Sequence, residues 1–391
     1  MKSSTAQRVV TWSIALILLF SIIAPVLADD TTNPLIEFLE PTPDNNDYQT
    51  ERYVNINVSI EEENLDALKY NWDGINYTIY DDSLILMYNF DNIAIIGEDS
   101  STIVDMSSNE NTGSVDGAIW DSSGRSNGAF DFDGEDDYID VTGVKDLING
   151  VSAITLSLWV KSDEIGTDKG MIIGKEVDGH DDVLSIRYDV DGLSGNQDNV
   201  IKVGLTTTVT GITQIESSAS VQTTSWQHIV VTWSSGESIK LYLDGELDVL
   251  SSDDGAATGT ITGLTQFIIG KGPKDEITSW NGSIDEIKIW NRALSKEEIY
   301  QQYISNLQRV NQTHWMLSLN QGKNATEDLD IGTYTYQAFA EDTNNNEAST
   351  EQRTIHITGP SPPVPEVSTF YLFFTGLLMA IGLLCVKGGK K

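Results

Sequence analysis

The chain has 391 residues, and its 59 acidic against 23 basic side chains give a formal net charge of −36 at pH 7. A protein this acidic repels phosphate groups, which excludes nucleic acid and anionic lipid surfaces as partners. Hydrophobic residues make up 39% of the chain, enough for packed cores, so the composition excludes a disordered protein.

The N-terminus is expected to be a signal peptide over residues 1–28. Lys2 and Arg8 precede an apolar run, 12–27, which ends at the small residue Ala28. A charged segment, an apolar segment and a small residue in this order are typical of secretory signals. An N-terminal membrane anchor is the alternative interpretation. The chain is therefore expected to be exported.

Residues 29–82 are expected to form the first part of a β-sandwich. Apolar and polar residues alternate over 54–60, which predicts a half-buried strand. Two further strands are expected at 68–72 and 77–80, with a tight turn between them. Three strands cannot close a sandwich, so its other half has to come from a later part of the chain.

Residues 83–305 contain short strands separated by Gly, Asp and Asn turns, which predicts a two-sheet antiparallel sandwich. The strongest local signal is the Asp244-Gly245 hairpin turn. Near the end of this region, Ser295 and Glu298 have the spacing of a helix capping box.

The order of the segments in this region resembles the laminin-G-like jelly-roll family of the concanavalin A-like lectin/glucanase superfamily. The resemblance implies one antiparallel jelly roll over 83–305. It is carried by residues 87–91, 104–109, 128–139, 155–160, 226–233, 239–245 and 282–295.

Residues 306–358 are expected to complete the first sandwich, with strands at 314–319, 332–342 and 353–357. Leu329, Gly332 and Tyr334, followed by Ala338-x-Ala340-x-Asp342, resemble the late strands of immunoglobulin-like or fibronectin-type domains. This resemblance implies that Tyr334 forms a tyrosine corner and that Trp72 is a buried core residue. The expected fold is therefore all-β, with a jelly roll inserted into a smaller Ig-like sandwich. Two independent half-domains are the alternative.

The C-terminus is expected to be a Pro-rich linker, 359–366, followed by a transmembrane or sorting segment, 367–391. Twenty uncharged residues rise about 30 Å as a helix, and terminal lysines fit the positive-inside pattern. Pro365-Glu366 before a short span with a basic end resembles the archaeal PEF-CTERM sorting signal. That resemblance implies replacement of the tail by a lipid anchor, and a retained transmembrane helix is the alternative. The single cysteine, Cys385, lies in this tail, so the exported body has no disulfide.

No catalytic residue is expected. Glucanases of the superfamily need two carboxylates on either side of one glycosidic bond, and the strand-borne acid motif that supplies them is absent from 83–305. The Gly124-x-Ser126-x-Gly128 string matches a serine hydrolase motif, but it does not lie on the strand-to-helix elbow that this chemistry requires. His228 lies in an apolar strand and is expected to be structural.

Structural Ca²⁺ is the one cofactor expected. Carboxylate and amide oxygens are frequent in the predicted turns, and calcium binds such ligands. Solvated turn residues are the alternative interpretation of these acids. One candidate site joins Asp91 to Asp285, which the family resemblance pairs, with Asp105 or Asp137 adding an oxygen, and the other is a local loop with Asp189, Asp191 and Asp198.

These features predict a non-enzymatic binding or adhesion protein, anchored at the outer face of the cell membrane, with an extracellular glycan or surface protein as partner. Trp280, in the loop 270–282, is the candidate for an exposed aromatic that stacks on a sugar. A structural envelope component without a ligand is the alternative, and an extracellular glycosidase is the second. An exported chain also allows N-glycosylation at the sequons of Asn57, Asn76, Asn281, Asn311 and Asn324.

Overall fold

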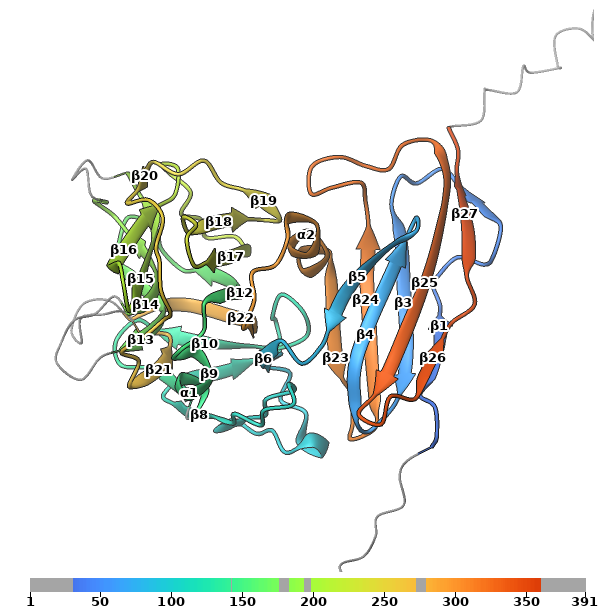
Figure 1. Cartoon of the computed structure of the whole chain (residues 1–391), viewed down its shortest axis with the longest axis horizontal. Coiled ribbons are helices and arrows are strands. Elements are labelled where there is room, and N and C mark those ends of the chain that lie inside the picture. The colour runs from blue at the N-terminus through green and yellow to red at the C-terminus, as the bar shows by residue number, and fades with distance from the viewer. Residues whose placement is uncertain (1–30, 142, 176–182, 193–197, 272–278, 360–391) are drawn as a thin grey trace, which may run out of the picture.

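The structure is a computed structural model that describes residues 31–141, 143–175, 183–192, 198–271 and 279–359 (Figure 1). The predicted signal peptide, nearly all of the linker, the C-terminal segment and Cys385 lie outside these residues. In the part of the chain that is described, no helix has the length and apolarity needed to cross a membrane.

Two sheets built from both ends of the described chain form a unit that we call the small sandwich. One sheet has the order β1-β3-β24-β23, and the other has the order β2-β27-β25-β4-β5, with β26 beside β25. The strands are β1 Leu35–Leu39, β2 Asp47–Gln49, β3 Val54–Glu61, β4 Leu65–Trp72, β5 Ile75–Tyr80, β23 Ser305–Arg309, β24 His314–Gln321, β25 Gly332–Asp342, β26 Glu347–Ser349 and β27 Arg353–Ile357.

The early and late strands of the small sandwich pair directly with each other. β24 runs antiparallel to β3, and β25 runs antiparallel to β4, so each of the two sheets contains strands from both chain segments. Trp72 is buried and stacks on Tyr334 with ring centroids 5.3 Å apart. The Tyr334 hydroxyl donates a hydrogen bond to the Asp330 carbonyl at 3.0 Å, which is the contact expected of a tyrosine corner.

The residues between these segments form two larger antiparallel sheets, which we call the large sandwich (Figure 1). The first, the inner sheet, has the order β19-β18-β17-β12-β22-β10-β9, with β6 beside β22. Its strands are β6 Leu84–Tyr88, β9 Ile119–Asp121, β10 Ala129–Asp133, β12 Ala153–Ser162, β17 Gln227–Ser234, β18 Lys240–Leu243, β19 Glu246–Leu247 and β22 Asn281–Trp290.

The second, the outer sheet, has the order β20-β16-β15-β14-β13-β21-β11-β8-β7. Its strands are β7 Thr102–Ile103, β8 Gly113–Asp116, β11 Tyr138–Val141, β13 Lys169–Lys175, β14 Leu184–Asp189, β15 Val200–Thr207, β16 Gly211–Glu216, β20 Ser252–Asp253 and β21 Gln266–Ile269. Two short helices, η1 Ala94–Ile96 and α1 Val144–Ile148, lie in the connections.

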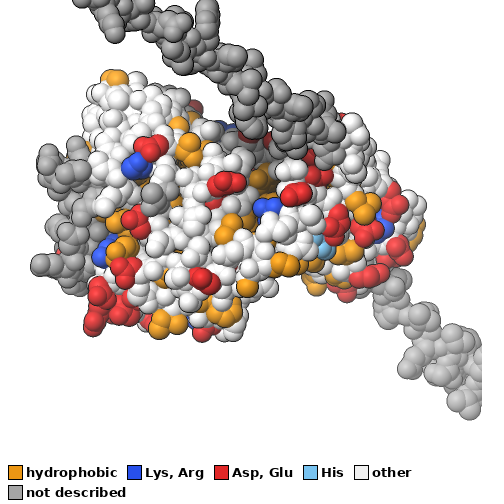
Figure 2. All heavy atoms as spheres, turned by 90° about the horizontal axis from the view of Figure 1, so that it is seen from below, with side chains coloured by type: hydrophobic (Ala, Val, Ile, Leu, Met, Phe, Trp, Pro, Cys, Tyr) orange, Lys and Arg blue, Asp and Glu red, His pale blue; other side chains and the backbone are white. Residues whose placement is uncertain are grey.

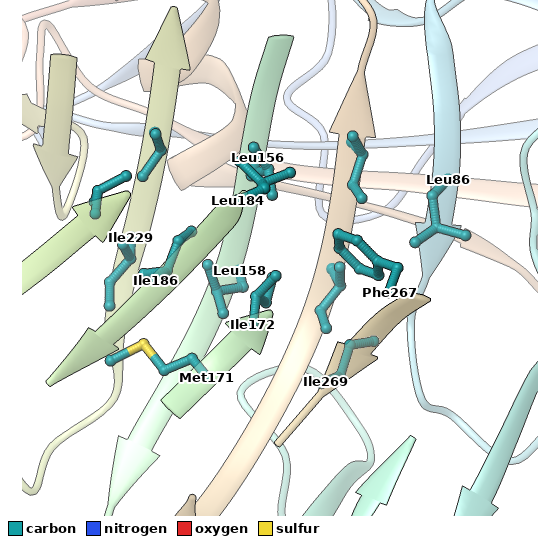
Figure 3. Close-up of a cluster of buried hydrophobic side chains, with 14 of the residues drawn as sticks. Leu86, Leu156, Leu158, Met171, Ile172, Leu184, Ile186, Ile229, Phe267 and Ile269 are labelled. Carbon is teal, nitrogen blue, oxygen red and sulfur yellow. The ribbon is translucent and has the colours of Figure 1, made fainter. Parts of the chain in front are cut away.

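Apolar side chains from the two large sheets meet in one core. Figure 3 shows Leu156, Leu158 and Ile229 of the inner sheet together with Ile172 and Ile186 of the outer sheet. In β12 the alternate residues point away from this core, because successive side chains of a strand face opposite sides. The predicted Asp244-Gly245 turn is present, with both residues at positive φ, and it joins β18 to β19.

The helix α2, Lys296–Ile304, lies between the two sandwiches (Figure 1). It begins with the predicted capping box of Ser295 and Glu298. Trp290 and Tyr242, on the far side of the inner sheet from its own core, belong to the same apolar cluster as the core of the small sandwich. The two sandwiches therefore share buried apolar surface rather than being joined only by chain connections.

Candidate functional site

The surface of the inner sheet that faces α2 and the small sandwich has an apolar part and a polar part. The apolar part, which includes Val230, Tyr242 and Trp290, is packed into the shared core. The polar part comes from the same strands, but it is not covered by apolar side chains. It forms one wall of a cavity between the two sandwiches.

This cavity has a volume of about 420 Å³, within the range of small-ligand sites. We call it the inter-sandwich cavity. Its second wall is the polar side of β3 and β24, opposite to the apolar residues that these strands bury in the small sandwich. The lining residues used below are Asn55, Asn57, Ser318 and Asn320 from the small sandwich, Arg125, Ser157, Trp159, His228, Glu286 and Lys288 from the large sandwich, and Gln302, Tyr303 and Ser305 from the end of α2.

Aromatic rings form part of the cavity wall. Trp159 on β12 stacks with Tyr303 at 5.6 Å and with His228 at 4.9 Å between ring centroids. The guanidinium of Arg125 lies over the Trp159 ring, 4.3 Å from its centroid. A cation thus already packs against this aromatic surface, as expected from the negative face of an indole ring.

Glu286 and Lys288 are charged residues at the wall of the cavity, each about 5% exposed. Their side chains form an ion pair of 3.8 Å between Nζ and Oε2, longer than a hydrogen bond. Neither carboxylate oxygen of Glu286 has a hydrogen-bond partner among the described residues. Burial raises the pKa of Glu286, while Lys288 opposes this shift, and burial lowers the pKa of Lys288.

A β-bulge in β22 explains how these charges reach the cavity side. Ser157 of β12 lies opposite Lys288, whereas Trp159 lies opposite Asp285, so β22 has one extra residue in this interval. Glu286 sits in the bulge with a φ of 51°, an unusual value for a residue with a side chain. Unusual backbone geometry and an unsatisfied buried carboxylate coincide here, and both features cluster at functional sites.

His228 and Ser157 form a buried hydrogen-bonded pair, with 2.8 Å between Nε2 and Oγ. Burial lowers the pKa of His228 to about 3, and the nearby Lys288 and Arg125 contribute in the same direction. A neutral imidazole with such a low pKa is a weak base, so the pair does not resemble an activated serine nucleophile. The His228 Nδ1 atom is buried and has no partner among the described residues.

Two of the predicted calcium ligands, Asp91 and Asp285, hold the same loop. Asp285 accepts a hydrogen bond from the Ser126 backbone at 3.0 Å, and Asp91 accepts one from the Gly128 backbone at 3.3 Å. Burial raises the pKa of both carboxyls, to about 6 for Asp91. The loop they hold carries Arg125, so these acids help to position the cavity wall.

Asp105 and Asp137 have other roles in the structure. Asp105 is buried and accepts backbone hydrogen bonds from Met87, Ser107 and Asn111, which tie a loop to β6. Asp137 lies near Asp133 and Asp136, and these three could hold a metal ion.

The local loop acids are arranged differently. Asp189 forms ion pairs with Arg187 at 3.6 Å and with Lys202 at 3.8 Å. Asp191 is exposed, and Asp198 follows the undescribed residues 193–197. Basic side chains therefore already occupy the Asp189 carboxylate.

Trp280 is fully buried, so the expectation of an exposed aromatic at this position is wrong. Its ring lies edge-on to Tyr188 at 5.2 Å, inside the core of the large sandwich. The neighbouring Gly and Lys residues suggested a surface loop, and residues 272–278 lie outside the described part of the chain. The side chain nevertheless packs between the two large sheets.

The five sequon asparagines lie at different depths. Asn76 is exposed, whereas the other four are partly buried and bonded to their surroundings: Asn57 to the Glu40 carbonyl, Asn281 to Glu164, and Asn311 and Asn324 within their own turns. Asn57 also lines the inter-sandwich cavity, where a glycan would compete with a ligand.

A protein-family model matches most of the large sandwich. Residues 133–300 match the family model described as the concanavalin A-like lectin/glucanases superfamily. This segment is a concanavalin A-like jelly-roll domain. The match begins later than the boundary predicted at residue 83. It contains Trp159, His228, Glu286 and Lys288, so four side chains of the cavity wall belong to the concanavalin A-like domain itself.

The solved structures to which the chain is similar are distant in sequence. Domain 4 of AbnA, a GH43 extracellular arabinanase from Geobacillus stearothermophilus in complex with arabinotriose, is 18% identical over 55% of this chain and 96% of that one, with a TM-score of 0.40. The binding domain of Paraclostridial Mosquitocidal Protein 1 is 17% identical over 58% of this chain and 54% of that one, with a TM-score of 0.39.

The receptor-binding domain of botulinum neurotoxin D is 16% identical, covering 57% of this chain and 52% of that one, with a TM-score of 0.40. This chain thus spans about half the length of the two toxin fragments. No curated protein matches the sequence.

Sequence reasoning missed the inter-sandwich cavity and its central residues. Glu286 and Lys288 were visible as charges inside an otherwise apolar strand, between Ile284 and Trp290. An unexplained charge in a buried strand is the signal that would have found them, since charged side chains are seldom buried without a partner.

Proposed function

We propose that the protein is a non-enzymatic, cell-surface binding protein that takes a carbohydrate ligand in the inter-sandwich cavity. The supporting observation is the combination of an aromatic wall with polar groups that lack partners. Sugars present apolar ring faces and many hydroxyl donors, which suit such a mixed surface.

The free polar atoms of the cavity are mainly hydrogen-bond acceptors. The carboxylate of Glu286, Nδ1 of His228 and Oε1 of Gln302 are buried without a partner among the described residues. Leaving such groups unsatisfied costs about 1–3 kcal/mol each. A polyhydroxyl ligand that donates to them would recover this free energy. Asn55 and Asn320, exposed on the opposite wall, add amide donors and acceptors.

Anchoring at the outer face of the cell is part of the proposal. It rests on the signal-like residues 1–28 and the apolar segment 367–391, whose sequence patterns were described above. The acidic surface is compatible with this location: Figure 2 shows acidic side chains dispersed over one face among few basic ones. A structural envelope component would share this surface but would not need the cavity.

Replacing Trp159 by alanine is expected to weaken glycan binding at least tenfold, because it removes the aromatic wall and the support of Arg125. The measurement is binding of the full-length protein to an array of neutral, acidic and amine-bearing oligosaccharides, followed by titration of each hit. Tyr48→Ala is the control, because Tyr48 is an exposed aromatic outside the cavity. Equal binding by the Trp159→Ala variant would overturn the assignment of the site.

Calcium is expected to raise the melting temperature relative to EDTA if Asp133, Asp136 and Asp137 hold the ion. Three carboxylates without the ion repel one another, and a bound divalent cation stabilises the folded state by mass action. Asp136→Asn should reduce the shift, whereas Asp328→Asn, at an exposed acid of the small sandwich, should preserve it. An unchanged melting temperature with calcium would refute a structural calcium ion.

A further inference from the structure

The hydrogen bonds around the inter-sandwich cavity do not by themselves account for the charged groups that surround it. One carboxyl group and two cationic side chains line it, and three further carboxyl groups lie behind this lining and act on it electrostatically. Only one of the four, Glu286, has an ion-pair partner among the described residues. The acids are Asp91, Asp244, Asp285 and Glu286, and the cations are Arg125 and Lys288.

These groups all come from the large sandwich, whereas the residues of β3 and β24 that line the opposite wall are uncharged. Asp285, Glu286 and Lys288 lie on β22, and Asp244 is at the β18–β19 turn, where its carboxylate accepts a hydrogen bond from the His228 backbone at 2.9 Å. Asp91 follows β6, and Arg125 is on the loop before β10. The uncharged titratable neighbours are His228 on β17 and Tyr303 on α2. The surplus of acid is therefore confined to the large-sandwich side of the site, around Glu286.

Glu286 is the acid best placed to receive a ligand. It lines the cavity, is about 95% buried, and offers two carboxylate oxygens without a hydrogen-bond partner among the described residues. Its ion pair with Lys288 is long, at 3.8 Å. An uncharged hydroxyl would satisfy one oxygen, but a charged N–H donor would also offset the negative charge, and such bonds are about twice as strong.

The aromatic wall beside Glu286 is also suited to a cation. The guanidinium of Arg125, an exposed loop residue, already lies 4.3 Å from the centroid of the Trp159 ring. The indole face thus attracts positive charge at the cavity side. A ligand cation that approaches Glu286 would lie near the same rings of Trp159 and Tyr303.

We infer that the cavity selects a carbohydrate that carries a free amino group, with the ammonium of the sugar bound at Glu286 beside the Trp159 wall. This inference rests on the proposed function, because it specifies the chemical class of the ligand for the same site. The protein then discriminates an amino sugar from its N-acetylated form, which has the same ring but neither the charge nor two of the N–H donors.

The test compares two probes on the full-length protein: a glucosamine trisaccharide and an N-acetylglucosamine trisaccharide, titrated by calorimetry alongside the oligosaccharide array. The wild type is expected to bind the amine form at least tenfold more tightly. Glu286→Gln keeps the shape of the side chain and removes its charge, so it should bring the ratio of the two affinities close to one. Glu297→Gln removes the same charge from the exposed side of α2 and should keep the preference.

Proton linkage gives a second readout that a merely structural role of Glu286 would not produce. Burial is the first cause of the raised pKa of all four acids, so a bound ammonium should favour their ionised forms and release protons. Affinity for the amine probe should therefore rise between about pH 6 and about pH 8, the pKa values of Asp91 and Glu286, and affinity for the acetylated probe should change less.

The outcomes separate the two proposals. Equal or tighter binding of the acetylated trisaccharide, or array hits confined to neutral or acidic glycans, would overturn the amino-sugar inference and leave the proposed function in place. Binding to no oligosaccharide at all would overturn both. A Glu286→Gln protein that melts like the wild type but retains the tenfold preference would also reject the inference.

Discussion

Replacing Trp315 by alanine is expected to lower the free energy of unfolding by about 3–5 kcal/mol, the usual cost of removing a buried tryptophan. Trp315 is 2% exposed in the core of the small sandwich, and its Nε1 donates a hydrogen bond to the Glu62 carbonyl at 3.1 Å. Its ring contacts Tyr80 at 5.6 Å between centroids and lies under the guanidinium of Arg309. The variant therefore loses a large apolar contact and the hydrogen bond to Glu62.

Urea unfolding followed by far-UV circular dichroism measures this loss. Ile331→Ala is the control, since Ile331 is 67% exposed, and it should change the free energy of unfolding by less than about 0.5 kcal/mol. A loss below about 1 kcal/mol for Trp315→Ala would show that Trp315 does not pack as described.

Replacing Lys288 by methionine is expected to destabilise the protein in a pH-dependent way. The variant leaves Glu286 buried without a cation, which costs about 3–5 kcal/mol when the carboxylate is ionised. Burial raises the pKa of Glu286 in the folded state, and loss of Lys288, which lowers it, raises it further. When the pKa of a group is higher in the folded state than in the unfolded state, its contribution to the stability of the folded protein is lost as the pH rises through the folded-state pKa.

At about pH 5 the free energy of unfolding of the variant should therefore be close to that of the wild type. At about pH 9 the variant should be much less stable than the wild type. Urea unfolding at several pH values measures this difference. A double variant, Glu286→Gln with Lys288→Met, should recover most of the loss, because neither buried charge remains. The same loss at every pH would contradict the pairing of the two side chains.

Local features of the sequence predicted local features of the structure well. The alternation of 54–60 became β3, the Asp244-Gly245 pair became a hairpin turn, and Ser295 with Glu298 became a helix cap. Each of these depends on residues close together in the chain. The concanavalin A-like domain was also predicted, because the order of its segments is itself written in the sequence.

The position of Trp280 shows where such reasoning fails. Its neighbours in the sequence are those of a surface loop, yet the side chain contacts Tyr188, more than ninety residues earlier in the chain. Local composition does not reveal such a contact. The structure also shows that Asp91 and Asp285 accept hydrogen bonds from one backbone loop, while the prediction that they share an ion stays a prediction.

The sequence by itself determined the strands, their turns, the acidic surface and the family of the larger domain, because these follow from periodicity, turn chemistry and composition. Only the tertiary structure decided where a ligand fits. Alternation shows that Ser157, Trp159 and His228 share one side of a sheet and that Asn55 and Ser318 lie on polar sides of other strands. It does not show that these surfaces face each other. That depends on α2 and Trp290 packing the two sandwiches together, which leaves the polar remainder of the contact as a cavity.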